Sequence, residues 1–435
     1  MNRPPALFGV LAVLAACSLG PALASDDSPS GIPADGSRVV VIGDSITQAG
    51  DYVVFVEAFL LTRFPDRTIT IINHGLSSET AAGTSEPDHP SRRPWIHDRF
   101  DRDVTAWEPD IVVACYGMND GIYHPFAPER FEAYQRGMLR LIDRARNDAS
   151  ARVDLLTPPP YDPYRRQVSD PDATEYGYRF PVVNYDTVLA RYAAWVRSLA
   201  DENLRVADVN STLAEHVAAR RSARVSFSIM PDGVHPNPTG HWLIAQSLLE
   251  SWDAPALVAE ARIDAETLRS SSAQVSHLTR DDEGLSFSWH SPLPMPIDPR
   301  CDPESIRLAT VADRLNRYRL TVTGLADGRY RLLAAESATG DPQPMAVVTA
   351  SELADGIDLT GLTEFPTVVA AQEVLNALAR HRSAQAQAWR KSIQDDEPPS
   401  IPPPGEDGDI MRSIRDLCRP RDLLIRLEPV ADQAP

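Results

Sequence analysis

The segment Gly43-Asp44-Ser45-Ile46-Thr47 places a serine where a predicted strand gives way to a predicted helix. The preceding run Val39–Ile42 is apolar throughout, which predicts a strand buried on both faces, and residues 51–64 carry apolar side chains at helical spacing. Ligands bind at the carboxyl ends of strands in an open α/β sheet, and a helix N-terminus favours developing negative charge. Ser45 is therefore a candidate nucleophile for attack on an ester. Asp44 and Ser45 are also common helix-capping residues, so this segment alone leaves both interpretations open.

Three further polar segments occur in the same region of the chain. They are Asn73-His74-Gly75-Leu76-Ser77-Ser78-Glu79-Thr80, Tyr116-Gly117-Met118-Asn119-Asp120 and Pro231-Asp232-Gly233-Val234-His235-Pro236. With Gly43-Asp44-Ser45, their order and spacing resemble the four sequence blocks of the SGNH hydrolases, also called GDSL esterases and lipases. The resemblance covers residues 38–253. Ile46 replaces the leucine of the name motif, and Ser78 stands where some members have a second glycine.

Asp232 and His235 have the side chains that a serine nucleophile requires. A serine hydroxyl attacks well only when a base takes its proton, and His235 is the candidate base. Asp232, three residues earlier, would orient the imidazole and stabilise the imidazolium that forms during attack. His235 beside Pro236 also fits an ordinary loop histidine, so the assignment depends on the four blocks together.

The resemblance also implies an oxyanion hole, the group of donors that stabilises the tetrahedral intermediate. The family draws these donors from the backbone N–H of the serine, the backbone N–H of the second-block glycine and the amide of the third-block asparagine. The corresponding residues here are Ser45, Gly75 and Asn119. Gly75 also fits a turn that needs positive φ, and Asn119 also fits a residue that pins its own loop. The resemblance implies no cofactor.

Residues beside these blocks are candidates for the substrate cleft. Tyr123 and His124 closely follow Asn119 and fit either the cleft or the core, and residues 158–179 predict a surface excursion that forms one cleft wall. Asp120 is expected to brace its loop rather than to react. The other histidines are scattered singly, without the close spacing of a metal site, so we expect no metal.

Strand-like and helix-like segments alternate between residues 38 and 255. This alternation predicts a mostly parallel sheet between two layers of helices, which is the three-layer α/β/α, flavodoxin-like fold of an SGNH hydrolase domain. Such a sheet brings the polar segments to one edge. The predicted strands are 39–42, 68–73, 110–116, 153–157 and 205–209, and the predicted helices are 51–64, 97–107, 128–147 and 184–202.

The composition bounds the size and the partners of the protein. With 435 residues, 43% of them hydrophobic, the chain is long enough for two or three domains with large cores. Its formal net charge of −19 argues against binding to nucleic acid, whose phosphates need a basic surface. An acidic chain sets no limit on an ester substrate, whether small molecule, glycan or lipid.

Residues 1–24 have the pattern of a signal peptide, in which a basic residue precedes a short apolar stretch. The small residues at 22 and 24 fit ordinary signal peptidase. Residues 14–17 instead resemble a bacterial lipobox, which would leave Cys17 lipidated and the protein tethered to a membrane. Both interpretations predict an exported protein that is periplasmic, outer-membrane-anchored or extracellular.

Three cysteines follow Cys17 in the sequence. Cys115 falls in a predicted buried strand and is expected to be a structural thiol. Cys301 and Cys418 form a candidate disulfide, since exported proteins carry such bonds. Sequence separation does not show whether two cysteines lie close enough to bond, so the pair stays open.

Residues 275–435 predict a smaller, β-rich α+β domain. A hairpin turn is expected at 326–328, a helix at 367–390 and a disordered acidic, proline-rich stretch at 395–409. The expected strands are 286–290, 317–323, 329–333, 344–349 and 422–427. No aromatic ladder or catalytic cluster identifies a partner for this domain.

These features predict an exported serine ester hydrolase that works through an acyl-serine intermediate. Removal of O-acetyl groups from carbohydrate is one use outside the cell. Lysophospholipase or lipase-like activity and acyl transfer by the same triad are alternatives, because the sequence does not fix the acyl group or the acceptor. A surface binding protein with a retired hydrolase scaffold is the alternative from a different class.

Overall fold

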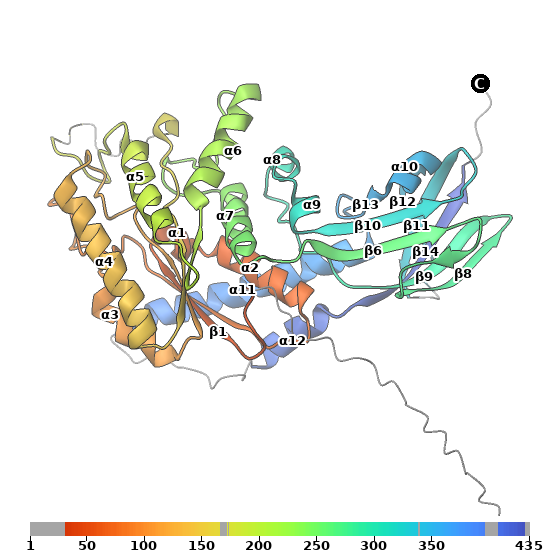
Figure 1. Ribbon diagram of the computed structural model, residues 1–435, viewed down its shortest axis with the longest axis horizontal. Coiled ribbons are helices and arrows are strands. Elements are labelled where there is room, and N and C mark those ends of the chain that lie inside the picture. Colours follow the sequence, from red (N-terminus) through yellow and green to blue (C-terminus); the bar gives the residue numbers. More distant parts are fainter. Residues whose placement is uncertain (1–30, 166–171, 173, 338–339, 396–407, 431–435) are drawn as a thin grey trace, which may run out of the picture.

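The computed structural model describes residues 31–165, 172, 174–337, 340–395 and 408–430. An α/β part and a β-rich part lie side by side, and helix α11 (Pro366–Gln394) runs from the β-rich part back across the α/β part (Figure 1). The predicted export signal at 1–24 lies outside the described residues. No helix in the described part of the chain combines the length and the apolar character needed to cross a membrane.

A parallel sheet forms the centre of the α/β part. Its strands are β1 (Arg38–Gly43), β2 (Thr70–Gly75), β3 (Ile111–Cys115), β4 (Arg152–Leu156) and β5 (Leu204–Ala207). Their order is β2-β1-β3-β4-β5, and every neighbouring pair is parallel. All residues of β1 and β3 are buried, which explains their unbroken apolar runs. The predicted fold is confirmed, and each strand end lies within two residues of its prediction.

Helices cover both faces of this sheet. They are α1 (Ser45–Ala49), α2 (Asp51–Arg63), α3 (Ile96–Asp103), α4 (Pro128–Asn147), α5 (Tyr185–Ser198), α6 (Val209–Ala223) and α7 (Pro238–Ser251). Helices α3, α4 and α5 lie on one face, whereas α2 and α7 lie on the other (Figure 1). The helix predicted at 97–107 ends at Asp103, and a 3₁₀ turn follows at Thr105–Trp107. This arrangement leaves the turns after the strands at one edge of the sheet.

The described residues of the β-rich part form two sheets around one core. The strands are β6 (Leu257–Asp264), β7 (Arg269–Ser270), β8 (Val275–Asp281), β9 (Gly284–Ser291), β10 (Arg317–Thr323), β11 (Arg329–Glu336), β12 (Gln343–Thr349), β13 (Ile357–Asp358) and β14 (Arg421–Pro429). Their orders are β13-β10-β6-β7 and β12-β11-β14-β9-β8. Trp289, Tyr318 and Leu332 from the two sheets are buried in the shared core. The first strand, β6, precedes the start that the sequence predicts for this domain, residue 275.

The predicted β-hairpin across residues 326–328 is wrong. The flanking strands β10 and β11 belong to different sheets, and β10 pairs with β6 and β13 whereas β11 pairs with β12 and β14. Alternate residues of both strands face the same core from opposite sides. Two strands of one sheet and two strands of facing sheets show the same alternation. The sequence pattern therefore could not distinguish a hairpin from two facing strands.

Helix α11 connects the two parts through contacts with the α/β part. Arg382 of α11 donates to both carboxylate oxygens of Glu57 in α2, and the Trp389 indole N–H donates to Asp103 over 3.1 Å. The Trp389 ring also stacks on His74 of β2, with 4.5 Å between ring centroids. The remaining helices are α8 (Pro303–Leu308), α9 (Val311–Arg314), α10 (Ala350–Asp355) and α12 (Asp409–Leu417). The helix predicted at 367–390 is thus confirmed. Most of the stretch at 395–409 lies outside the described residues.

The candidate disulfide between Cys301 and Cys418 is not formed. Both cysteines are buried free thiols, as is Cys115 in β3. The Cys418 thiol instead donates to the carbonyl of Ile414, one turn earlier in α12. Burial raises the pKa of Cys301 and of Cys418 to about 12, so both stay protonated.

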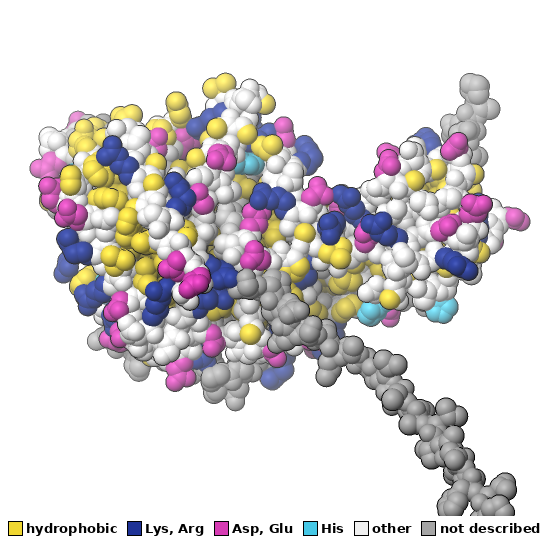
Figure 2. Space-filling model, in the orientation of Figure 1, with side chains coloured by type: hydrophobic (Ala, Val, Ile, Leu, Met, Phe, Trp, Pro, Cys, Tyr) yellow, Lys and Arg dark blue, Asp and Glu magenta, His cyan; other side chains and the backbone are white. Residues whose placement is uncertain are grey.

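On one face of the molecule, charged side chains are not gathered by sign. On the face that Figure 2 shows, acidic and basic side chains alternate over both parts, and the outline narrows between the two. The net charge of −19 is therefore not concentrated in one patch on this face.

Candidate active site

Ser45 is the first residue of α1, and Asp44 alone separates it from the end of β1. Asp44 is the N-cap, and its carboxylate accepts the N–H of Ile46 over 2.9 Å. A Cβ on Gly43 would lie 2.7 Å from the carbonyl oxygen of Cys115, so only glycine lets β1 turn into α1 this close to β3. The two interpretations of the sequence therefore apply to different residues, because Asp44 caps the helix and leaves the Ser45 hydroxyl free for chemistry.

The Ser45 hydroxyl lies within hydrogen-bonding distance of the His235 imidazole, which comes from the loop between α6 and α7. The Nε2 atom of His235 lies 2.9 Å from Ser45 Oγ, and Nδ1 of the same ring lies 2.6 Å from Asp232 Oδ2. The other oxygen, Oδ1, accepts the backbone N–H groups of Val234 and His235 over 2.9 and 2.7 Å. Three predicted site residues thus form one hydrogen-bonded chain from carboxylate to hydroxyl.

The charge of Asp232 favours proton uptake by His235. Burial raises the pKa of Asp232, but hydrogen bonds from the side chain and backbone of His235 and from the backbone of Val234 outweigh it and lower that pKa to about 2. The hydrogen bond to Asp232 raises the pKa of His235 above its ordinary value, against the opposing effect of burial. Asp232 is therefore ionised, and the imidazolium form of His235 is stabilised.

Asn119 follows β3 and has its side-chain amide held in one orientation. Its Oδ1 accepts hydrogen bonds from the Tyr123 hydroxyl over 3.0 Å and from Arg93 Nη1 over 3.1 Å. Its Nδ2 donates to the carbonyl of Glu79 over 3.2 Å. Because an amide nitrogen carries two hydrogens, one N–H of Asn119 remains to stabilise an oxyanion.

Gly75 does not offer the N–H that the resemblance implied. Its N–H donates over 2.9 Å to the side-chain Oδ1 of Asn73, two residues earlier. A Cβ on Gly75 would lie 2.3 Å from the backbone nitrogen of Gln48 in α1. Gly75 is therefore required by the close approach of β2 to α1, and its predicted role as an oxyanion donor is corrected.

Ser78 is the residue between positions 75 and 80 whose backbone N–H has no acceptor among the described residues. The neighbouring N–H groups of residues 75–77 and 79–80 all have acceptors, whereas that of Ser78 has none within the described part of the chain. Ser78 has a φ of 64°, in the left-handed region that favours glycine. Its carbonyl accepts from Arg93 Nη1, the atom that also donates to Asn119, so Ser78 and Asn119 are neighbours. The sequence signal was the glycine that some family members have at this position.

Tyr123 and His124 lie beside the site in different ways. Tyr123 is 1% exposed, and its hydroxyl donates to Asn119 Oδ1, so it helps to orient that amide. His124 is partly buried and its ring contacts the edge of Tyr176. Burial lowers the pKa of His124, which keeps the imidazole neutral.

Tyr178, which belongs to the predicted surface excursion 158–179, lies near the site. It is 44% exposed, and its ring packs edge-on against Tyr123 with 5.4 Å between centroids. Burial raises the pKa of Tyr178 first, and the nearby charge of Asp232 raises it further. Tyr178 therefore places an accessible aromatic ring against Tyr123, near enough to Asp232 for the charge of that carboxylate to raise the pKa of Tyr178. Residues 166–171 and 173 of the predicted wall lie outside the described residues.

Asp120 braces the loop, as predicted. Its Oδ1 accepts the backbone N–H groups of Ala81 and Ala82 over 2.9 and 2.8 Å. Burial raises the pKa of Asp120 to about 7, and that of the helix cap Asp44 to about 6. Among the described residues, no group of three or more His, Cys, Asp or Glu is arranged to hold a metal ion.

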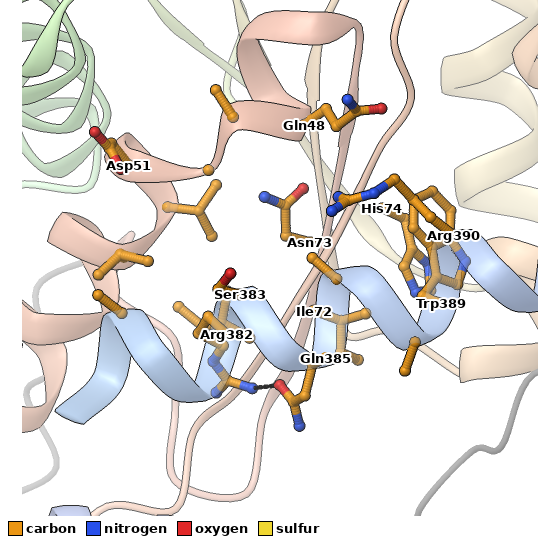
Figure 3. A pocket seen from close by; sticks show the side chains of 18 of the residues that line it. Gln48, Asp51, Ile72, Asn73, His74, Arg382, Ser383, Gln385, Trp389 and Arg390 are labelled. Atoms are coloured by element: carbon orange, nitrogen blue, oxygen red, sulfur yellow. Dashed lines mark hydrogen bonds between the residues drawn. The ribbon is translucent and has the colours of Figure 1, made fainter. Parts of the chain in front are cut away.

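A cavity of about 570 Å³ lies behind α1, between β2 and α11 (Figure 3). Gln48 and Asn73 lie on one side of it, and Ser383 and Trp389 of α11 lie on the other. Ser45, Asp232 and His235 are not among the residues that line it within the described chain. This cavity is thus separate from the hydrogen-bonded residues Ser45, His235 and Asp232.

Comparisons with known proteins agree with this geometry. The model of the GDSL-like lipase/acylhydrolase family matches residues 41–243. An acetylxylan esterase from Geobacillus stearothermophilus is 23% identical over 241 residues, which cover 49% of this chain and 93% of the relative. A solved structure, a gut microbial diltiazem-metabolizing enzyme, has a TM-score of 0.73 at 20% identity and covers 93% of this chain and 100% of its own. The fold of both parts therefore recurs in a known structure. Residues 41–243 therefore match the domain of the SGNH, or GDSL-like lipase/acylhydrolase, family, and the findings support an ester-cleaving hydrolase.

Proposed function

We propose that Ser45 is the nucleophile, His235 the general base and Asp232 the carboxylate that orients it. The observation that carries this assignment is the continuous contact from Asp232 Oδ2 through the His235 ring to Ser45 Oγ, over 2.6 and 2.9 Å. Both distances lie within the range for proton transfer between a nucleophile and its base.

The reaction follows from this geometry in two steps. His235 Nε2 takes the proton of Ser45 while Oγ attacks the ester carbonyl, and the imidazolium then gives that proton to the departing alcohol, which leaves an acyl-serine. A water molecule attacks the acyl group by the same route, transfers a proton to His235 and releases the acid. The proton finally returns to Ser45 Oγ, so the enzyme is regenerated.

We assign the oxyanion hole to Ser45 N–H, Asn119 Nδ2–H and Ser78 N–H. The first two were expected, and Ser78 takes the role assigned to Gly75 because the Gly75 N–H is already donated to Asn73. Backbone and amide donors fixed before the reaction stabilise the developing negative charge without reorganisation.

The proposed substrate is a short acyl ester, such as an O-acetyl group, on a carbohydrate. The acetylxylan esterase that matches 49% of the chain supports this class. Tyr178, 44% exposed beside Asp232, supports it further, because an accessible aromatic ring can pack against the apolar face of a sugar. The pattern of residues 1–24 supports action outside the cytoplasm, where glycan esters are available.

The substrate class is tested by comparing kcat/KM for acetylated xylooligosaccharides, a lysophospholipid and 4-nitrophenyl esters of increasing acyl length. Acetyl esters should react fastest, and Tyr178→Ala should lower kcat/KM for the oligosaccharide by roughly 2- to 10-fold while it leaves 4-nitrophenyl acetate nearly unchanged. The exposed Tyr164→Ala is the matched control. Preference for long acyl chains would favour a lipase, and a rate that depends on an added alcohol would favour acyl transfer.

A further inference from the structure

A buried ion pair stands directly behind the proposed oxyanion donors. Arg93, in the loop between β2 and α3, donates through Nε and Nη2 to the two carboxylate oxygens of Glu86, each over 2.6 Å. Both side chains are 1% exposed. Two charges removed this far from water are costly unless every polar atom is satisfied, so the position of each hydrogen bond in the pair is tightly constrained.

The third nitrogen of Arg93 reaches the oxyanion donors. Nη1 donates to Asn119 Oδ1 over 3.1 Å and to the carbonyl of Ser78 over 3.3 Å. A guanidinium is a rigid planar fork, so once Glu86 fixes two of its nitrogens, the direction of the third is set. Glu86 thereby fixes Arg93, and Arg93 fixes Asn119 and Ser78.

These contacts determine which way the Asn119 amide points. A flipped amide would bring its N–H groups against the donor Arg93 Nη1 and its oxygen against the carbonyl oxygen of Glu79, so both hydrogen bonds would be lost. With the donors in place, Nδ2 must face away from them. The hydrogen bond from Arg93 Nη1 to the Ser78 carbonyl likewise holds Ser78 at its φ of 64°. This left-handed conformation is unfavourable for serine.

The same pair also contacts Tyr178 and Tyr123. Glu86 Oε1 accepts the backbone N–H of Tyr178 over 3.3 Å, and the Arg93 guanidinium lies 5.7 Å from the centroid of the Tyr123 ring. One ion pair therefore contacts both the oxyanion donors and the residue beside the triad carboxylate.

We propose that Arg93, held by Glu86, is a positioning residue that aims the N–H groups of Asn119 and Ser78 at the oxyanion. This inference rests on the proposed function, since it assigns Arg93 a role in the same reaction. Arg93 does not touch the substrate. It acts through the two residues that its Nη1 atom contacts.

The test replaces the whole pair, because loss of one partner would leave an unpaired buried charge and unfold the protein for unrelated reasons. The variant Glu86→Leu/Arg93→Met fills the same space with apolar side chains of similar size. The matched control is Glu57→Leu/Arg382→Met. It replaces a second ion pair in which an arginine donates to both oxygens of a carboxylate, and this pair joins α2 to α11 rather than supporting Asn119. Both variants are made in the full chain, with and without Asn119→Ala, and hydrolysis of 4-nitrophenyl acetate is measured after subtraction of the Ser45→Ala rate.

We expect Glu86→Leu/Arg93→Met to lower kcat by roughly 10- to 100-fold with little change in KM, since a donor misplaced by about 1 Å loses most of its effect. In the Asn119→Ala background the same replacement should cost less than about 5-fold, because its main target is already gone. The control pair should lower the melting temperature but leave kcat within about 2-fold. Arg93→Lys should also lower kcat relative to the unchanged protein, since an ammonium cannot bind Glu86, Asn119 and Ser78 together as the planar guanidinium does.

Two outcomes would overturn the inference. One is a folded Glu86→Leu/Arg93→Met protein with the kcat of the unchanged protein. The other is an equal loss of kcat with and without Asn119, which would mean that the pair supports the fold alone. Either result leaves the proposed function intact as long as the rate depends on Ser45. A rate that does not depend on Ser45 would reject the proposed function and the inference with it.

Discussion

His235 Nε2 lies 2.9 Å from Ser45 Oγ although 190 residues separate the two in the chain. One residue begins the first helix of the sheet domain, and the other lies in the loop that precedes its last helix. Parallel strands bring both ends of the domain to one edge, and the short loop with Asp232 then turns the imidazole toward the serine. This contact is the basis of the proposal that Ser45 is the nucleophile.

Asp232→Asn should lower kcat by roughly 10³- to 10⁴-fold. The asparagine can still accept the backbone N–H groups of Val234 and His235, but it no longer favours the imidazole tautomer whose Nε2 accepts the serine proton. Steady-state kinetics on 4-nitrophenyl acetate measure the effect, and circular dichroism verifies the fold. A loss of less than about 10-fold would exclude Asp232 as the orienting carboxylate.

The acid limb of kcat/KM should lie above pH 6.5, the ordinary pKa of histidine. His235 acts as a base only when neutral, and the bond to Asp232 raises its pKa, so activity appears as pH rises through that higher value. Removal of the carboxylate charge in Asp232→Asn should move the limb toward lower pH. A profile with the same limb in both proteins would contradict the assignment.

Asn119→Ala should lower kcat by roughly 10²- to 10³-fold and change KM little. The amide N–H stabilises charge that develops only in the transition state, so its loss falls on the chemical step. Inactivation by a fluorophosphonate should slow in parallel, since its phosphoryl oxygen occupies the same position. A rise in KM at constant kcat would instead assign Asn119 to ground-state binding.

Ser78→Gly and Gly75→Ala should have opposite effects. Glycine at 78 keeps the N–H and relieves a φ of 64°, so kcat should be retained and stability should rise by up to about 1 kcal/mol. Alanine at 75 forces its Cβ to within 2.3 Å of the Gln48 nitrogen and should cost roughly 1–3 kcal/mol, with displacement of α1 and loss of kcat. Thermal unfolding and kinetics on both variants measure these effects. Loss of activity in Ser78→Gly alone would show that the serine hydroxyl, rather than the N–H, is needed.

The sequence predicted the sheet domain well because its signals are local. The apolar runs of β1 and β3 are buried on both faces, and the polar blocks follow directly where those strands end. A parallel sheet then allows few other placements for Ser45, Asn119 and the Asp232–His235 pair.

The remaining features depend on contacts between distant residues. The alternation in β10 and β11 fits one sheet or two facing sheets, and the distance between two cysteines is invisible in their spacing. The role of Gly75 was reassigned because the acceptor of its N–H, Asn73, became visible only in three dimensions. Arg93 gave no sequence signal at all, since an arginine in a polar loop is ordinary until its partners Glu86 and Asn119 are known.

The most direct measurement is the rate of 4-nitrophenyl acetate hydrolysis by Ser45→Ala, alongside labelling of the unchanged protein with a fluorophosphonate. The account predicts a loss of roughly 10⁴-fold or more in kcat, a fold unchanged by circular dichroism, and label found on the peptide that contains Ser45. A fully active Ser45→Ala protein, or label on another serine, would contradict it.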